Sequence, residues 1–322
     1  VKAFTTDHFT SKNYPNAGLY NSGSPTNNNN LPLVSYTWVS ASGLKADGSA
    51  YMGRKAQREL IVQAMKSVID TNQTIREEDN FFNLISCPGY PELQPDMVVL
   101  NNDRNNTAYI VGDTPLRLSD SATDIQAWAN NDAGATSTGE DGLVTRNTYL
   151  GIFYPSGITN DLSGNQVVVP ASHMMLRTFL RNDTIAYPWL AAAGTRRGNI
   201  DNALNIGYLD RTTGEFQVIK TRIGIRDTLY VNQINPMVFF TGVGLLNYGN
   251  KNSYNSQSAL DRINVRRLLL QARKLISAVA VRLLFEQNDD KVRQDFLDSV
   301  NPILDSIRRD RGLIDFRVVV TN

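Results

Sequence analysis

Histidine and cysteine are scarce in this chain of 322 residues, which contains only His8, His173 and Cys87. A single cysteine cannot form an internal disulfide, and two histidines cannot build a histidine-rich metal site. Histidine is also the side chain that enzymes use most often as a general base. We therefore predict no catalytic residues, no metal ligands and no cofactor, which argues against an enzyme.

The chain also lacks an excess of charge of either sign, because 32 Lys and Arg face 31 Asp and Glu. A net charge of +1 gives no long-range attraction to nucleic acid or to an anionic membrane. No run of about 18 apolar residues is present, so the sequence predicts no membrane segment. The chain starts at Val1 without a signal-peptide pattern, and it stops at Asn322 inside a strand-like run. We therefore expect a fragment of a longer polypeptide.

Three short segments invite a chemical interpretation, and each has a simpler structural one. Cys87 precedes Pro-Gly at a strand end, where a buried structural thiol is the usual role. The Gly-Val-Gly at 242–244 lacks the following helix of a phosphate loop, which indicates a turn. The acidic residues at 139–142 lack the ligand spacing of a calcium loop, which indicates a solvated loop. An enzyme using Cys87 or the Glu77–Glu78 pair stays open as a rival.

Apolar periodicity divides the chain into a polar lead-in at 1–33 and a long ordered region. Strands and helices then alternate, which favours a parallel or mixed sheet with helices against it. The expected strands are 34–39, 80–86, 107–112 and 148–154, and the expected helices are 51–70, 95–102 and 119–129, the last capped by Ser119.

The second half is predicted to contain two long helices, at about 260–285 and 289–309, followed by Gly312 and a strand over 313–320. Before them we expect a polar loop at 156–167, a helix at 170–179, a hairpin over 204–219 turning at 212–214, and a strand at 236–243. The fold class is therefore mixed α/β, with two sandwich-like domains and a C-terminal helix pair plus strand. The predicted divisions are 1–33, 34–180 and 181–322.

Cations are concentrated on the first long helix. They form either a solvated face balanced by acids elsewhere or a contact face for an acidic partner. Few aromatic residues lie between them, which disfavours a nucleic-acid platform. The cations are Arg262, Arg266, Arg267, Arg273, Lys274 and Arg282.

The start of this helix, Asp-Arg-Ile-Asn-Val-Arg-Arg-Leu at 261–268, resembles the corresponding helix of contractile (myovirus-type) bacteriophage tail sheath proteins. A Phe-Glu-Gln-Asn stretch at 285–288 resembles the family's connection to the next helix, with Gln287 where proline is usual. Segments 187–198, 234–237, 241–244 and 247–250 are similar to family motifs, although Thr241 and Tyr248 replace a proline and a tryptophan. Residues 85–89 resemble a family strand and turn. These departures indicate a divergent member, such as one from a large phage.

The resemblance implies a structural subunit of the sheath, which surrounds the inner tail tube and contracts to drive it through the host envelope during genome delivery. It implies hexameric rings stacked helically, contacts with the tube and the baseplate, and a place in the virion tail after assembly in the host cytoplasm. It also implies an outer or middle domain at 34–180 and a sheath core domain at 181–322. The family's C-terminal arm would follow Asn322, so we expect this fragment to be monomeric in dilute solution.

In this family a basic helix of the inner domain faces the tube. By position, the candidate contacts to the inner tube or to a neighbouring subunit are Arg262, Arg266, Arg267, Arg273 and Lys274. A capsid or baseplate subunit remains the alternative among viral structural proteins, because it would also lack catalytic residues.

Overall fold

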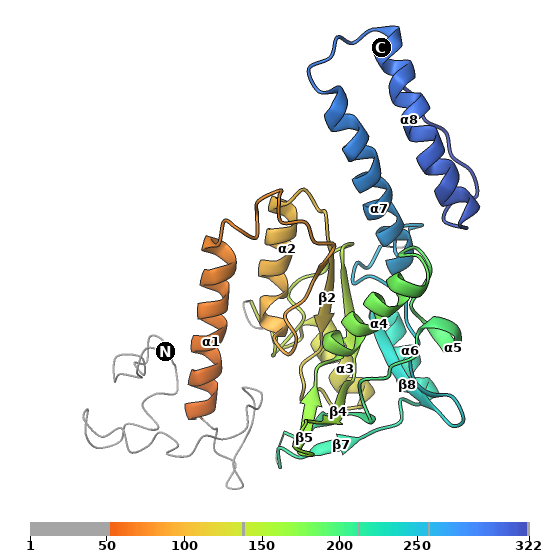
Figure 1. The fold of residues 1–322 in the computed structure, drawn as a ribbon. Helices are drawn as coiled ribbons and strands as arrows, with labels where there is room; N and C mark the ends of the chain where they lie inside the picture. Colours follow the sequence, from red (N-terminus) through yellow and green to blue (C-terminus); the bar gives the residue numbers. More distant parts are fainter. Residues whose placement is uncertain (1–51, 137–138, 212, 257, 321–322) are drawn as a thin grey trace.

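A computed structural model describes residues 52–136, 139–211, 213–256 and 258–320 (Figure 1). The predicted lead-in at 1–33, with His8, and the predicted strand at 34–39 lie outside the described residues. The remaining chain forms two sheets, helices on the first sheet, and a helical hairpin that projects from the body. The predicted mixed α/β class is confirmed.

The central sheet is parallel except at one edge, in the order β1-β2-β3-β8-β9. The first four strands pair in parallel, and β9 pairs antiparallel to β8 through a turn at Gly242 and Gly244, both of which have positive φ. This confirms the prediction of a mixed sheet and of a turn, not a phosphate loop, after β8. The strands are β1 (Leu84–Ile85), β2 (Tyr109–Asp113), β3 (Leu150–Tyr154), β8 (Ile234–Phe240) and β9 (Gly244–Asn247).

Both faces of the central sheet are buried, which explains why its strands are apolar without alternation. Ile110 and Ile152 point to one core, and Val111 and Phe153 point to the other. Each of these four side chains has no exposed surface. Successive side chains of a strand point to opposite faces, so a strand between two helical layers must be apolar throughout.

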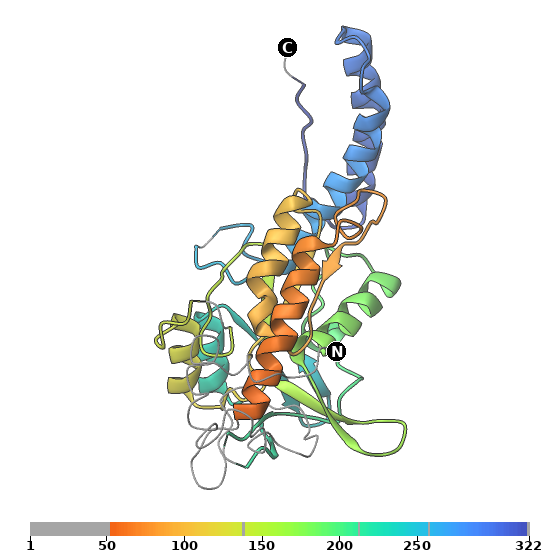
Figure 2. The same ribbon diagram turned by 90° about the vertical axis from the view of Figure 1, so that its left-hand side faces the viewer.

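Helices cover the two faces with different cores. The first core is closed by α2 (Gln94–Asp103), α3 (Ala122–Asn130) and α6 (Ile223–Val231), through residues such as Met97, Trp128 and Leu229. The second is closed by α4 (Ala171–Ile185) with Met174 and Phe179. A further helix, α1 (Met52–Thr71), packs beside α2 on the outside (Figure 2). The predicted helices at 51–70, 95–102 and 170–179 are thus confirmed, whereas α6 was not predicted.

The second sheet is antiparallel, in the order β5-β4-β6-β7. Its strands are β4 (Ser156–Asn160), β5 (Gln166–Val169), β6 (Asn205–Leu209) and β7 (Phe216–Val218). The predicted hairpin at 204–219 is confirmed, but the predicted loop at 156–167 is wrong because it forms the β4–β5 hairpin. The carboxylate of Asp161 accepts hydrogen bonds from the amides of Ser163 and Asn165, so polar residues here build a tight turn.

The two predicted long helices are α7 (Ile263–Ala280) and α8 (Asp290–Arg309), joined by a 3-10 turn at Val281–Leu283 and a short loop. They form a hairpin that extends away from the sheets (Figure 1). Its core contains Leu268 from α7, Val300, Leu304 and Ile307 from α8, and Trp189 from the loop before the short helix α5 (Gly194–Arg197). Among the helices of the described residues, we find none with the length and apolar character that a bilayer crossing requires.

Three local predictions need correction. The N-cap of α3 is Ser121, not Ser119, because the Ser121 side chain accepts from the Asp124 amide. Arg311, not Gly312, takes the left-handed conformation after α8, with φ of 63°. Residues 313–320 form no strand within the described chain. Leu313, Phe316 and Val318 instead pack on the hairpin, so their apolar side chains are partly buried without strand pairing.

One buried carboxylate joins the central sheet to α4. Asp113, the last residue of β2, accepts hydrogen bonds from the amide of Gly89 (2.8 Å), the amide of Ser172 (2.5 Å) and the hydroxyl of Ser172 (2.7 Å). It therefore caps the first turn of α4 from outside the helix. Burial raises the pKa of Asp113 to about 6, against the lowering effect of these hydrogen bonds.

This pKa predicts a pH dependence of the free energy of unfolding. The folded chain holds the Asp113 proton more tightly than the unfolded chain, where the ordinary pKa is 3.8. The stability that this group contributes is therefore present below about pH 4 and is lost as the pH rises through 6, by roughly 3 kcal/mol in total. Urea unfolding from pH 4 to 7 measures this loss. Asp113→Asn, which cannot ionise, should flatten that part of the profile; an unchanged slope in the variant would contradict the assignment.

Candidate functional site

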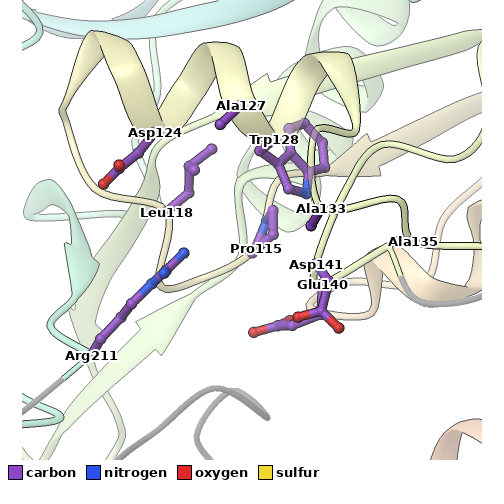
Figure 3. A pocket seen from close by; sticks show the side chains of 10 residues that line it. All are labelled: Pro115, Leu118, Asp124, Ala127, Trp128, Ala133, Ala135, Glu140, Asp141 and Arg211. Carbon is purple, nitrogen blue, oxygen red and sulfur yellow. The ribbon is translucent and has the colours of Figure 1, made fainter.

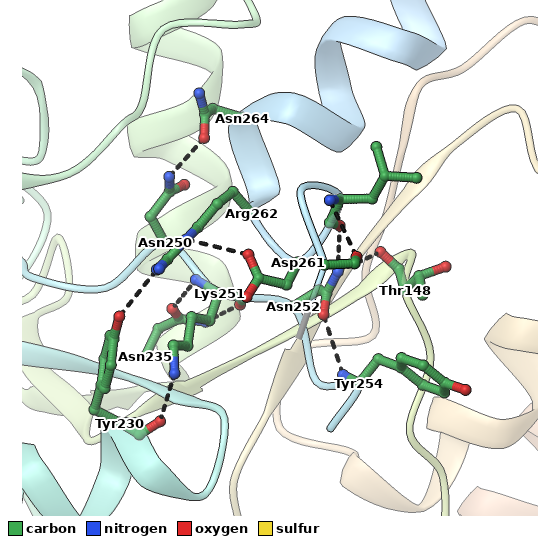
Figure 4. A network of polar contacts seen from close by, with 12 residues as sticks. Thr148, Tyr230, Asn235, Asn250, Lys251, Asn252, Tyr254, Asp261, Arg262 and Asn264 are labelled. Atoms are coloured by element: carbon green, nitrogen blue, oxygen red, sulfur yellow. Dashed lines mark hydrogen bonds and ion pairs between the residues drawn. The ribbon is translucent and has the colours of Figure 1, made fainter. Parts of the chain in front are cut away.

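The start of α7 is fixed by a network of asparagine side chains at the end of the central sheet (Figure 4). The Asn235 amide group donates to the carbonyls of Ile152 (3.0 Å) and Lys251 (2.7 Å) and accepts from the Lys251 amide (2.7 Å). Its side chain thereby satisfies backbone groups of β3 and of the loop before α7. Gly249 lies so close that an added Cβ would stand 2.6 Å from the Asn235 side chain, which explains a glycine there.

Other asparagines continue the network toward α7. Asn252 donates to the carbonyls of Thr148 (3.2 Å) and Leu260 (2.9 Å), and Asn250 donates to the side chain of Asn264 on α7 itself (2.7 Å). Asn252 is fully buried, so water cannot reach its side chain. Its bonds to the two carbonyls therefore take the place of hydrogen bonds to water. The segments 234–237, 247–250 and 261–268, which carry the resemblance, therefore meet at one place in the fold.

The structure separates the five candidate cations into two sets. Arg266 and Arg267 are buried, with 8% and 4% of their surface exposed. The Arg267 guanidinium forms an ion pair with Asp183 of α4 and lies 4.8 Å from the centre of the Phe179 ring. The Arg266 guanidinium lies 4.5 Å from the centre of the Tyr149 ring. These two side chains attach α7 to the body of the same chain, so they are not part of its outer surface.

Arg262, Arg273 and Lys274 lie nearer to solvent. Arg262 donates to the Tyr230 hydroxyl (3.1 Å) and pairs with Asp261 (3.2 Å). Arg273 and Lys274 are exposed on one side of α7, where Arg273 donates to the Asn105 carbonyl (2.7 Å). The Lys274 amine lies 3.5 Å from the centre of the Phe81 ring. The predicted basic face is thus smaller than the sequence indicates, and it is centred on Arg273 and Lys274.

The residues considered for chemistry do not come together. The Cys87 thiol is half-buried, and burial, with smaller effects of Asp113 and Asp96, raises its pKa to about 11, which disfavours the nucleophilic thiolate. His173 is exposed on α4, and Glu77 and Glu78 are exposed after α1. Within the described ranges, no three His, Cys, Asp or Glu side chains are grouped as metal ligands would be.

A pocket of about 380 Å³ lies between α3 and the segment that follows it (Figure 3). Leu118, Trp128, Ala133 and Pro115 supply its apolar surface, and Asp124, Glu140, Asp141 and Arg211 supply its charges. Ser119 donates to the Asp124 carboxylate (2.5 Å), and Glu140 belongs to a buried cluster in which Arg58 lies 3.5 Å away. The expectation of a solvated loop at 139–142 is therefore wrong at Glu140, which is 7% exposed and pairs with Arg58 of α1.

Sequence reasoning located the segments of the network but not the role of their asparagines. Asn235, Asn247 and Asn252 are each nearly or fully buried. The available signal was the polar Asn235 between Ile234 and Pro236 in an apolar strand. A buried side-chain amide needs hydrogen-bond partners, so this position indicates a polar network. Asp113 after the apolar strand β2 gave a similar signal.

Comparison with known proteins gives one consistent result. No family model matches the chain. The chain is 38% identical over 137 residues to a tail sheath protein of Vibrio phage KVP40, and 32% identical over 139 residues to a tail sheath protein of Enterobacteria phage T4. These alignments cover 42% and 43% of this chain but only 19% of each relative, so they span about a fifth of the length of those proteins.

Solved structures agree on the fold. The chain superposes on a chain of the PVC sheath complex, an extracellular contractile injection system in the contracted state, with a TM-score of 0.55, 16% identity and coverage of 80% of this chain and 62% of that one. A chain of the anti-feeding prophage baseplate in the contracted state gives a TM-score of 0.55 with 18% identity, covering 77% and 62%. Sequence and fold together identify the chain as a divergent, partial relative of the phage tail sheath proteins.

Proposed function

We propose that the chain is a structural subunit of a contractile tail sheath. The sheath would surround the inner tail tube and contract to drive it through the host envelope during genome delivery. The observation that carries the proposal is the 38% identity with a phage tail sheath protein over 137 residues. The fold supports it, because chains of contractile assemblies share the arrangement of sheets and helices.

The partners follow from the same proposal. They are other copies of the subunit in hexameric rings stacked helically, the inner tube and the baseplate, within the virion tail after assembly in the host cytoplasm. Residues 34–180 would belong to an outer or middle domain and 181–322 to the core domain. Because β8 and β9 complete the sheet begun by β1, β2 and β3, these parts share one sheet and would move together.

In this proposal the subunit needs no catalytic step. Two side chains whose pKa is raised by burial have places in the fold: Cys87 packs against the first core, and Asp113 caps α4. The work of contraction would come from contacts between subunits that differ in the two states of the sheath. The second candidate function is that of a baseplate subunit, which would also need no catalytic step. The likeness to a chain of a baseplate assembly favours it.

The inner tube or a neighbouring subunit would contact the exposed cations of α7. Arg273 and Lys274 present two positive charges on an exposed part of the helix, and Arg262 adds a third near its start. Arg266 and Arg267 would act indirectly, because they hold α7 against Tyr149 and α4 and so set the direction of that surface.

Electron microscopy of the complete gene product, concentrated alone, tests the proposed function. We expect long hollow cylinders, because sheath subunits associate with copies of themselves. Flat rings or small complexes that form only with other tail proteins would favour the baseplate candidate. Uniform single subunits at every concentration and salt, both alone and mixed with other tail proteins, would contradict both candidates.

A pair of variants tests the division of the cations. Arg267→Met leaves Asp183 without its buried partner and should lower the free energy of unfolding by roughly 2 kcal/mol. Arg273→Glu with Lys274→Glu removes the exposed bond to Asn105 and the contact with the Phe81 ring, and should lower the free energy of unfolding by no more than about 1 kcal/mol. The double variant should nevertheless reduce the fraction of tubes that carry a sheath, as counted in micrographs. Normal sheathing by the stable double variant would remove these residues from the contact.

A further inference from the structure

The α7–α8 hairpin projects from the sheets, so its angle depends on how its base is held (Figures 1 and 2). α7 is attached to the body at its first turns, through the buried Ile263, Arg266 and Arg267. Further along the helix, Arg273 and Lys274 contact the body from exposed positions, where such contacts contribute little. α7 contains 18 residues and is about 27 Å long, so an attachment at its first turns alone would leave its far end free to move.

A second attachment is made by residues 187–190, which lie between α4 and α5. Trp189 is 8% exposed and packs in the core between α7 and α8. Its indole Nε1 donates to the carbonyl of Asp310, the residue that follows α8 (3.0 Å). Its own carbonyl accepts from the side chain of Asn264 in the first turn of α7 (3.2 Å). One residue therefore contacts the start of one helix and the end of the other.

Tyr187 adds to this attachment from the outer side. Its ring stacks on the Trp189 ring, with centroids 4.7 Å apart and planes inclined by 3°. The charge of the nearby Asp310 carboxylate raises the pKa of Tyr187, so both aromatic side chains lie at the residue where α8 ends. Pro188 stands between them with a fixed φ, which restricts the conformations of the segment.

The same segment is bound to the body from two directions. Asn182 of α4, which is 1% exposed, donates from its side chain to the carbonyls of Tyr187 (3.3 Å) and Leu190 (3.0 Å). Just after the segment, the side chain of Asn247 on β9 donates to the carbonyl of Ala192 (2.8 Å). The segment is therefore fixed both to a helix that covers the central sheet and to the edge strand of that sheet.

We infer that residues 187–190 form a latch that sets the angle between the hairpin and the sheets. With the latch in place, the hairpin is held at the start of α7 and at the end of α8, so it has one angle. Without it, α7 remains attached at its first turns and the hairpin takes a range of angles. The inference concerns the chain by itself and does not rest on the proposed function. In a sheath, the latch would also determine where Arg273 and Lys274 are presented.

The distance between two spin labels on the dilute chain tests the latch. In a Cys87→Ala background, the labels are attached at Ser277→Cys near the far end of α7 and at Gln126→Cys on α3, both exposed positions. Double electron–electron resonance should give one narrow distance distribution for this parent. Trp189→Ala should lose the narrow distribution and give a broad one. Asn182→Ala should do the same, because it keeps the hairpin core but removes both bonds from α4 to the segment.

Phe296→Ala is the matched control, because Phe296 packs in the hairpin core from α8 but is not part of the latch. It should lower the melting temperature and leave the distance distribution narrow. Circular dichroism reports whether the helices persist, and a broad distribution with unchanged helix content supports the latch. If Trp189→Ala loses helix content, Asn182→Ala decides by the same criterion. A narrow distribution in Asn182→Ala, or an equally broad one in Phe296→Ala, would overturn the inference.

Discussion

The direction of α7 depends on buried asparagine side chains. Their amides form the hydrogen bonds that water would otherwise make with backbone groups of the irregular loop before the helix. Residues 249–253, which follow β9, belong to no strand of the two sheets, yet they are buried or half-buried beside β3 and β8. Asn235 and Asn252 hydrogen-bond its backbone, and Asn250 donates to the side chain of Asn264 on α7. Without them, buried backbone groups would lose hydrogen bonds worth about 1 kcal/mol or more each, and the helix would have no fixed starting point.

The buried arginines extend this constraint from the start of α7 into its second turn. Arg266 rests on Tyr149 before β3, and Arg267 pairs with Asp183 of α4, so the helix is attached to elements on both sides. Beyond that turn the helix packs against α8, Trp189 and the residues that follow α8, and Arg273 and Lys274 contact Asn105 and Phe81. The hairpin therefore has a fixed base and a tip that projects from the sheets (Figure 1).

Sequence patterns located the elements in which one physical signal dominates. Apolar residues at helical spacing placed α1, α7 and α8, and continuous apolar runs placed β2 and β3. Patterns failed where a polar side chain changes the local preference. The β4–β5 hairpin contains Asp161, whose carboxylate closes the turn, and the run at 313–320 has strand composition but packs on the hairpin. Asp113 and Asn235 could not be placed from sequence, because their partners are 59 and 83 residues away.

By itself the sequence determined the class of fold, the absence of a visible catalytic set and the resemblance to sheath proteins, because composition and short motifs are local properties. Only the tertiary structure decided which charges of α7 are available. The five candidate cations, Arg262 at the N-cap and four on α7, carry the same formal charge in the sequence. The packing of α4 and Tyr149 against the first turns buries Arg266 and Arg267, whereas Arg273 and Lys274 are exposed. Exposure depends on which distant residues cover a side chain, and no local pattern contains that information.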